Sequence, residues 1–332
     1  SVVPGGTVDF NLPYPATITL TSPIDINKDL TISGPGASNL TVGGGGSVSI
    51  FNILAGSSAN IASLRLANGQ ATGVSGGGIT NSGTLALTDS ELYNNQTDQY
   101  GGGLFNAPGS TAAISGSLFQ DNRSDLHGGG IYNGGTLTMI NSTLWGNAAP
   151  AISSQFGGGI YNAGTLTLRN STLDSNWQHN LYNAASGVLS FTNTILANSN
   201  GDCANNGTIT LNDHNLIEWE DPFDTSCGGT NLIQDDPQVI EPPADNGGPT
   251  LTLALSPGSP AIDAGDDGSC EEIDQRGVAR PQYAHCDIGA FEVENYPPTD
   301  IDLSNNNINE NQPSATLVGT LSTTDPDIGD SH

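Results

Sequence analysis

The chain has 332 residues, of which 34 are acidic and only six are Lys or Arg, giving a net charge of −28. This balance excludes a nucleic-acid-binding protein and disfavours an anionic membrane surface, because phosphate groups would be repelled. Hydrophobic residues make up 35% and 44 residues are glycine, which argues against a helical enzyme with a thick core. No apolar run reaches the roughly 18 to 20 residues of a membrane span, so we expect no membrane insertion.

The acidic residues are unevenly distributed along the chain. Residues 1–201 carry nine acidic and four basic side chains, whereas residues 202–332 carry 25 and two. The first part is rich in Gly, Asn, Ser and Thr, and the second holds all four cysteines. A shift of this size predicts a domain boundary near residue 200. We therefore expect a repeat domain over 1–200 and an acidic, cysteine-containing region over 201–296.

An internal repeat built around a glycine triplet runs through the first part. Each copy reads Gly-Gly-Gly, an aliphatic residue, a variable residue and Asn, and the first glycines lie 25, 27 and 29 residues apart. The copies are Gly76–Asn81, Gly101–Asn106, Gly128–Asn133 and Gly157–Asn162, with a degenerate copy at Leu181–Asn183 that lacks the glycines. Each copy then carries a segment of alternating residues, such as Gly164–Leu168, which is typical of a strand with one buried face.

Three short strands per repeat of this length indicate a solenoid, because one copy cannot bury its apolar face and stacked copies can. We therefore predict an all-β fold, a right-handed parallel β-helix over about residues 5–294. Glycine and asparagine would penalise a helix, and no stretch shows a helical period. The ends of a solenoid expose unpaired strand edges. We expect the region 201–294 to cap the C-terminal end and residues 2–14 to blunt the other.

Two columns of asparagines recur at fixed positions in the copies. We expect each column to stack in register, so that the amide of one coil bonds the amide of the next. Asparagine also tolerates the left-handed backbone of tight turns. The first column is Asn81, Asn106, Asn133, Asn162 and Asn183, and the second is Asn95, Asn122, Asn147, Asn176 and Asn198. The alternative use of asparagine is glycosylation, for which the sequons are Asn39–Thr41, Asn141–Thr143 and Asn170–Thr172.

Length differences between copies are concentrated just before each glycine triplet. Variable loops on one edge of a solenoid are usually where binding resides, although solvated turns are the simpler alternative. We predict a binding edge formed by Asp98, Tyr100, Asp125, His127, Phe156 and Trp177. The same edge offers a catalytic alternative, since polysaccharide lyases and hydrolases need convergent carboxylates near a base or an arginine. Asp98 and Asp125, with Arg123 and His127, form the best such group in the repeats.

The four cysteines fall into two local couples. Cys203 and Cys227 are 24 residues apart, and Cys270 and Cys286 are 16 apart. Four cysteines allow three pairings, and the short loops favour these two disulfides, each of which would stabilise by roughly 3 kcal/mol. Zinc is the alternative, but it needs close spacing such as Cys-x-x-Cys, which is missing. Disulfides imply an oxidising, exported location.

Two arginines, Arg276 and Arg280, are the only bases in residues 202–332. A catalytic role is one interpretation of the surrounding Asp-Gln-Arg-Gly segment. In a region of such high negative charge, we instead expect both guanidinium groups to form structural ion pairs or hydrogen bonds. The candidate partners are nearby acids such as Asp263, Asp274 and Asp287.

The glycine-triplet motif resembles the parallel β-helix repeats of bacterial surface proteins, including the chlamydial polymorphic outer-membrane proteins. A more specific match lies in the second half of the chain, which resembles the tail of the "choice-of-anchor Q" β-helix proteins. The matching segments are Ala244–Thr250, Ser256–Gly265, Asp274–Gly277, Arg280–Pro281 and Asp287–Glu292. The resemblance covers nearly all of residues 5–294. It implies export to a bacterial surface, and it implies no reaction.

Residues 297–332 resemble the opening of a cadherin-like domain. The matching segments are Pro298–Ile301, Ile308–Asn311, Val318–Leu321 and Thr324–Asp327. In such domains a glutamate and an Asp-x-Asp pair bind calcium between modules, so the resemblance implies Glu310, Asp325 and Asp327 as calcium ligands. Only the start of a domain is present, so we expect an incomplete domain and an incomplete site.

These observations predict a non-enzymatic, extracellular structural or adhesive protein of a bacterial cell surface. We expect no cofactor other than calcium. The expected partners are other copies of the chain, joined head to tail into a filament or stalk, or surface glycans and proteins. The start of the sequence lacks the pattern of a signal peptide, so we expect that this peptide has been removed or that the chain begins inside a longer one. The alternative function is a polysaccharide lyase or hydrolase acting at the loop edge.

Overall fold

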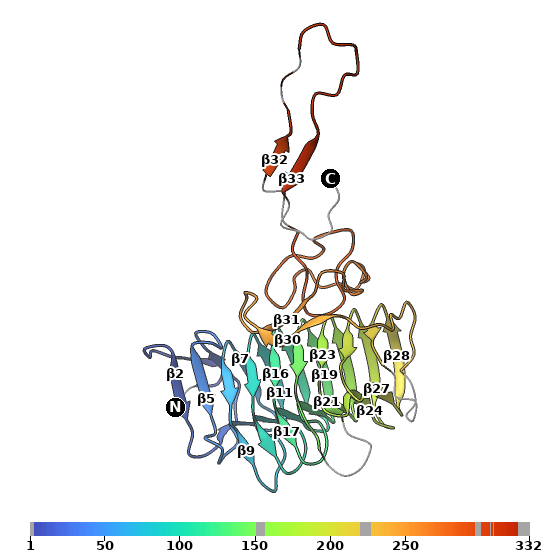
Figure 1. The fold of residues 1–332 in the computed structure, drawn as a ribbon. Coiled ribbons are helices and arrows are strands. Elements are labelled where there is room, and N and C mark those ends of the chain that lie inside the picture. The colour runs from blue at the N-terminus through green and yellow to red at the C-terminus, as the bar shows by residue number, and fades with distance from the viewer. Residues whose placement is uncertain are drawn as a thin grey trace. The chain divides into compact units, whose positions relative to one another are not determined.

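A computed structural model describes residues 3–150, 157–219, 227–295, 300–305, 307 and 309–324. The chain divides into a unit of residues 1–292 and a unit of residues 293–332. The first unit is a parallel β-solenoid, in which strands from successive coils stack along one axis (Figure 1). The described residues contain no helix, and so none that could cross a membrane. The all-β parallel fold predicted from the repeats is confirmed.

Three long parallel sheets form the walls of the solenoid. Sheet A runs β1 (Gly6–Asp9), β4 (Leu30–Ser33), β7 (Ser58–Ala62), β11 (Thr84–Thr88), β15 (Thr111–Ser115), β19 (Thr136–Ile140), β22 (Thr165–Arg169), β25 (Val188–Thr192) and β28 (Thr208–Asp213). Sheet B runs β2 (Ala16–Thr19), β5 (Leu40–Gly43), β8 (Arg65–Ala67), β12 (Glu91–Tyr93), β16 (Leu118–Gln120), β20 (Thr143–Trp145), β23 (Thr172–Asp174), β26 (Ile195–Ala197) and β29 (Leu216–Ile217). Sheet C runs β3 (Ile24–Ile26), β6 (Phe51–Ile53), β10 (Ile79–Asn81), β14 (Leu104–Asn106), β18 (Ile131–Asn133), β21 (Gly157–Asn162), β24 (His179–Asn183) and β27 (Gly201–Asn205).

A short fourth sheet, sheet D, lies at the variable inserts. It consists of β9 (Gln70–Ala71), β13 (Gln96–Thr97) and β17 (Arg123–Ser124), again paired in parallel. The inserts of neighbouring coils are therefore in register as well. This register places any side chain on one insert beside its equivalent on the next.

The core is a set of columns in which equivalent residues of successive coils lie on top of each other. Leu85, Leu137, Leu166 and Leu189 share one column of sheet A and are at most 1% exposed. The intervening residues of each strand, such as Thr138, face outward, as the alternating pattern predicts. Burying each leucine contributes roughly 1.5–3 kcal/mol, and no coil could gain this alone.

The glycine triplets let neighbouring coils approach closely. Gly128, the first glycine of its triplet, has a φ of 68°, which residues with a Cβ rarely adopt. A Cβ on the second glycine, Gly129, would collide with the backbone of Ala148 on the next coil. The triplet therefore recurs for two physical reasons, one conformational and one steric.

The first asparagine column forms the predicted ladder inside the solenoid. Each Nδ2 donates to the Oδ1 of the next coil, at 2.7–2.8 Å, from Asn81 through Asn106, Asn133, Asn162 and Asn183 to Asn205. The four side chains between Asn81 and Asn205 are fully buried. A buried amide is costly unless its hydrogen bonds are made. Each amide here finds its partner one coil away, and Asn205 extends the ladder beyond the predicted members.

The second column also forms a ladder, but its predicted last member is wrong. The chain of amide bonds passes from Asn95 through Asn122, Asn147 and Asn176 to Asn180, and then to Asp202. Asn198 is not part of it. Leu173 pairs with Leu196 rather than with Ile195, so Asn198 lies level with Ser175. Both residues occupy a left-handed turn, with φ of 57° and 53°.

The cysteines form the two predicted disulfides, Cys203–Cys227 and Cys270–Cys286. The first ties the last strand of sheet C to residues 227–233, where Thr230 and Ile233 bridge to Asp213 and Leu216 of the terminal coil. This short segment covers part of the C-terminal end of the solenoid, as predicted. The coils themselves continue past residue 200, so the composition shift at that point is not a structural boundary.

Residues 237–292, which we call the C-terminal strap, do not cap the end of the solenoid as the sequence predicted. They begin with the antiparallel pair β30 (Val239–Ala244) and β31 (Thr252–Leu255) and lie along the turn between sheets A and B (Figure 1). Four successive coils each bond the strap at this turn: Gly116 with Thr250, Asn141 with Ile273, Asn170 with Glu271, and Asn193 with Asp266. These left-handed turns direct their polar groups outward, and the strap is their partner.

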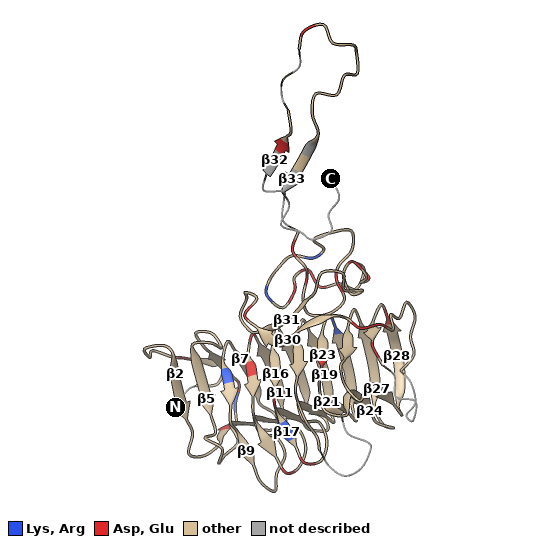
Figure 2. Cartoon of the chain, in the orientation of Figure 1, with Lys and Arg blue, Asp and Glu red and all other residues tan. Residues whose placement is uncertain are grey.

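The strap also carries a large part of the negative charge (Figure 2). The solenoid strands are mostly uncharged, whereas acidic side chains recur along the loops that follow β31 (Figure 2). In the second unit, β32 (Asp300–Leu303) and β33 (Leu321–Thr324) form an antiparallel pair.

Candidate functional site

A column of aromatic rings runs along the outward face of sheet C. Phe105, Tyr132, Tyr161 and Tyr182 occupy the same position in β14, β18, β21 and β24. Their ring centroids are 5.3, 5.4 and 5.3 Å apart, and the planes are within 24° of parallel. We call these four residues the aromatic column. Each ring stacks on the next because the parallel register repeats the same position every coil.

The hydroxyl groups of Tyr132 and Tyr161 stay protonated at neutral pH. Burial raises the pKa of Tyr132 and Tyr161, and neighbouring tyrosines raise it further. The Tyr182 hydroxyl accepts a hydrogen bond from Asn206 Nδ2 at 2.7 Å. Tyr182 is only 2% exposed, so the rings that the column presents to its surroundings are those of Phe105, Tyr132 and Tyr161, which carry no negative charge.

Two residues of the predicted binding edge extend this aromatic surface. Tyr100 and His127 lie on neighbouring inserts, joined by a parallel bridge, and their rings stack at 5.6 Å. His127 also stacks on Tyr161 at 4.4 Å, and Tyr100 lies 5.0 Å from Tyr132. The edge and the column thus form one aromatic surface.

The other predicted edge residues do not join it. Asp98 and Asp125 follow strands that are in register, but their carboxylates bond different partners. Asp98 accepts from the backbone N–H of Gly73 at 2.8 Å, and Asp125 forms an exposed ion pair with Arg123 at 2.9 Å. Trp177 is 54% exposed. Phe156 lies outside the described residues.

The aromatic column ends at Phe105, and a groove of roughly 470 Å³ opens there. The next two positions on the outward face of sheet C are Thr80 and Asn52, whose side chains are smaller than a ring. Val74 and Leu54 line the groove and are 59% and 41% exposed. This is the part of the outward face where an aromatic ring meets open space, and we call it the N-terminal groove.

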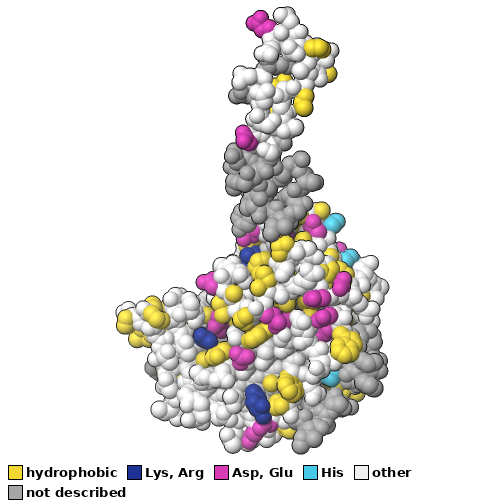
Figure 3. All heavy atoms as spheres, in the orientation of Figure 1, with side chains coloured by type: hydrophobic (Ala, Val, Ile, Leu, Met, Phe, Trp, Pro, Cys, Tyr) yellow, Lys and Arg dark blue, Asp and Glu magenta, His cyan; other side chains and the backbone are white. Residues whose placement is uncertain are grey.

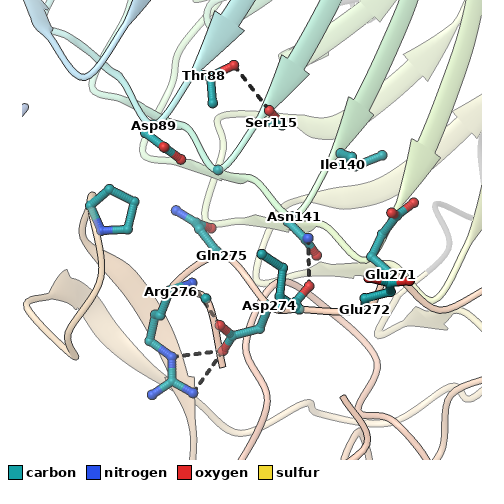
Figure 4. A pocket seen from close by; sticks show the side chains of 14 residues that line it. Thr88, Asp89, Ser115, Ile140, Asn141, Glu271, Glu272, Asp274, Gln275 and Arg276 are labelled. Atoms are coloured by element: carbon teal, nitrogen blue, oxygen red, sulfur yellow. Dashed lines mark hydrogen bonds and ion pairs between the residues drawn. The ribbon is translucent and has the colours of Figure 1, made fainter. Parts of the chain in front are cut away.

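A second cleft, of roughly 630 Å³, lies between the strap and the turn of sheets A and B (Figure 4). Asp89 lines it from the solenoid, and Asp274 and Arg276 line it from the strap. Arg276 is held by Asp274 at 2.8 Å and lies 3.6 Å above the Phe291 ring. Its role here is to fix the strap, as the sequence predicted, and the cleft is acidic on both sides.

Arg280 is the second structural arginine of the strap. It forms an ion pair with Glu292 at 2.8 Å, and both side chains are at most 1% exposed. Its guanidinium also donates to the carbonyl oxygens of Asp287 and Gly289. The predicted structural role is confirmed, although the carboxylate partner is Glu292 rather than one of the acids that the sequence suggested.

A buried pair of carboxyl groups joins the strap to sheet B. Asp174 of β23 is fully buried and shares a hydrogen bond with Glu241 of β30. Burial and the nearby Glu241 raise the pKa of Asp174 to about 8. Partial burial works against ionisation of Glu241, but hydrogen bonds from Asp174, Ser175 and Trp145 together hold its pKa below the usual value. The pair therefore holds one proton, which resides on Asp174.

The calcium ligands implied for the tail are not brought together by the described residues. Glu310 is exposed, and Asp325 and Asp327 lie outside the described residues. No group of three or more His, Cys, Asp or Glu in the described part of the chain has the geometry of a metal site. The calcium assignment remains a prediction.

Several features of this site were missed from the sequence. The tyrosines of the column stand at the fifth position of the repeated motif, so the repeat itself carried the signal. Glu241 and the burial of Asp174 left no such signal in the sequence, because the strap does not follow the repeat.

The face in Figure 3 shows acidic side chains among hydrophobic ones with only isolated basic groups, which fits the overall charge.

No known protein family matches the chain. No curated protein and no solved structure matches it either. A functional interpretation therefore rests on the features of the structure itself.

Proposed function

We propose that the chain is a non-enzymatic structural and adhesive protein, exported to a bacterial cell surface, of the type that the choice-of-anchor Q resemblance implies. Two disulfides fit an oxidising location. The buried asparagine ladders and the strap fit a rigid support. The observation that carries the adhesive role is the aromatic surface of sheet C, joined to the insert edge through His127 and Tyr161.

An aromatic surface on a rigid scaffold is suited to adhesion. Aromatic side chains supply large contact areas and lose little conformational entropy on binding. Phe105, Tyr132 and Tyr161 repeat the same contact on three successive coils, so a partner that spans these coils gains from each of them at once. The scarcity of basic groups disfavours anionic partners, and the uncharged rings of the column suit a neutral partner.

Two further parts of the proposal concern assembly and calcium. Strands β1, β2 and β3 are the outermost strands at the N-terminal end of their sheets, and outermost strands can pair with another copy of the chain head to tail. Residues 297–332 would begin a cadherin-like domain that binds calcium through Glu310, Asp325 and Asp327. Light scattering with and without calcium tests whether the chain assembles and whether calcium affects assembly. Assembly predicts growth of particle mass.

The adhesive role is tested with microspheres coated with the purified protein and applied to bacterial and host-cell surfaces. We expect wild-type microspheres to adhere and a Tyr132→Ala/Tyr161→Ala variant to adhere at least several-fold less. The matched control is Thr138→Ala, which alters an outward residue of sheet A. Circular dichroism establishes that each variant is folded.

The same preparation is assayed for turnover of acidic and neutral polysaccharides, with and without calcium. Release of new chain ends by the wild type, abolished in Asp125→Asn or His127→Ala, would establish the lyase or hydrolase alternative and overturn the proposal. Equal adhesion by wild type and the double tyrosine variant would remove its structural basis.

A further inference from the structure

The outward face of sheet C changes character at Phe105. On one side of this ring the column continues through Tyr132. On the other side, the register places Thr80 and then Asn52 where the next rings would stand. One face of Phe105 therefore looks along the solenoid axis into the N-terminal groove. Because Thr80 and Asn52 have smaller side chains than a phenyl ring, a space is left above them. These two floor residues lie one coil apart.

The groove has the size and lining of a small-ligand site. Its volume of roughly 470 Å³ falls within the usual range for such sites. Pro23, Leu54 and Val74 supply apolar walls, while Ser49, Ser82 and the floor residues supply hydroxyl and amide groups. None of the described residues that line it is charged.

The polar groups on the floor can still accept hydrogen bonds. Thr80 Oγ1 donates to the backbone carbonyl of Ser75 at 2.8 Å, and the same oxygen retains its capacity to accept a hydrogen bond. Asn52 Nδ2 donates to Asp25 Oδ1 at 3.0 Å, which fixes the amide and leaves its carbonyl oxygen as an acceptor. A ligand with several hydroxyl donors matches this lining.

We propose that the N-terminal groove binds a neutral glycan, with one pyranose ring stacked on the free face of Phe105 as the next member of the column. The proposal rests on the adhesive function and names its ligand class. A sugar presents an apolar ring face and equatorial hydroxyls, which match the phenyl face and the polar floor respectively. An anionic sugar lacks a basic partner here, and an aromatic side chain would give no donors to the acceptor oxygens of Thr80 and Asn52.

The structure supplies a substitution that closes the groove without disturbing the fold. Thr80→Tyr places a ring where the column would continue, and it should stack on Phe105 as Tyr132 does. Phe105→Ala removes the stacking face instead. The matched control is Thr138→Tyr, which makes the same change on the outward face of sheet A.

Binding is measured by isothermal titration calorimetry and by ligand-observed NMR. The probes are neutral hexasaccharides of glucose, mannose and N-acetylglucosamine, an oligogalacturonate as the anionic comparison, and a phenylalanine-containing peptide. We expect at least one neutral hexasaccharide to bind. Phe105→Ala and Thr80→Tyr should each weaken that binding about tenfold or more, and Thr138→Tyr should leave it unchanged.

Three results would overturn the proposal: no binding of any neutral hexasaccharide at millimolar concentration, tighter binding of the peptide or the oligogalacturonate, or binding that is insensitive to both groove variants. The adhesion assay separates this failure from failure of the proposed function. Microspheres that adhere while the hexasaccharides do not bind leave the adhesive role intact and remove only the groove. Wild-type microspheres that do not adhere remove the adhesive role itself.

Discussion

The carboxyl groups of Asp174 and Glu241 share a hydrogen bond at the point where the C-terminal strap crosses sheet B. Neither residue is near the other in the chain, and Trp145 and Ser175 donate to the same Glu241 oxygen at 2.6 and 2.5 Å. Asn198 Nδ2 donates to Asp174 at 2.8 Å. These donors stabilise one negative charge on the two carboxyl groups. A second negative charge on the pair would be repelled by the first.

The stability of the protein should therefore decrease as the pH rises. The pKa of Asp174 is about 8 in the folded chain and 3.8 when exposed, so the folded state holds the extra proton between these values. The contribution of this group to the free energy of unfolding is greatest below pH 4 and is lost as the pH approaches 8. We expect the wild-type Tm to be several degrees higher at pH 5 than at pH 9.

The variant Asp174→Asn isolates this effect from that of other carboxyl groups. An amide keeps the hydrogen bond to Glu241 and cannot ionise, so the variant should gain about 1–3 kcal/mol relative to wild type between pH 5 and pH 9. The measurement is chemical denaturation at both pH values. A pH dependence of the same size in the variant and the wild type would contradict the shared-proton interpretation.

The asparagine ladder should be intolerant of a gap in its middle. Asn133→Ala removes the ladder acceptor of Asn106 Nδ2 and the ladder donor to Asn162 Oδ1, and both of these asparagines are fully buried. We expect a loss of about 2–3 kcal/mol in the free energy of unfolding. Thr138→Ala, on the same coil but facing outward, should change it by less than about 0.5 kcal/mol. Equal effects of the two substitutions would show that the ladder contributes little.

Two ion pairs in the protein should differ sharply in importance. Arg280→Met leaves Glu292 buried without its cation and should cost about 3–5 kcal/mol. Arg123→Met breaks the exposed pair with Asp125 and should cost less than about 1 kcal/mol. Urea denaturation of both variants checks this ranking, which the two similar N–O distances alone would not suggest.

The disulfide Cys270–Cys286 joins two segments of the strap and should keep folded the part of it that contacts the coils. The double variant Cys270→Ser/Cys286→Ser should lose about 3 kcal/mol, and limited proteolysis should then cleave within residues 263–292. The matched variant Cys203→Ser/Cys227→Ser should instead expose the terminal coil near residues 200–219. Mass spectrometry of the fragments distinguishes the two sites. Cleavage at the same positions in both variants would contradict this division of roles.

The periodic part of the structure could be predicted from the sequence because its contacts join equivalent residues. Asn133 and Asn162 bond each other since each is the sixth residue of the same motif. The error at Asn198 has a local cause. The strand before it carries Ile195 and Leu196 in succession, and only the register of sheet B shows that Leu196 is the equivalent of Leu173.

The position of the strap could not be predicted, because its contacts join residues without a repeated spacing. Asn141 and Ile273 are 132 positions apart, as are Thr143 and Gln275. An acidic, cysteine-rich segment at the end of a solenoid suggested a plug for the open end. The position of the strap depends on its hydrogen bonds to one turn residue in each of four successive coils. These residues are Gly116, Asn141, Asn170 and Asn193, and only the structure shows that they lie in one line.

This line of contacts changes how the molecule should respond to force. A bare array of coils has only nearest-neighbour links and can unravel one coil at a time from a free end. A strap bound to four consecutive coils prevents this, because none of the four coils can separate before the strap is detached. The middle of the rod should therefore yield as a single mechanical block, with a higher rupture force than the coils between residues 3 and 90.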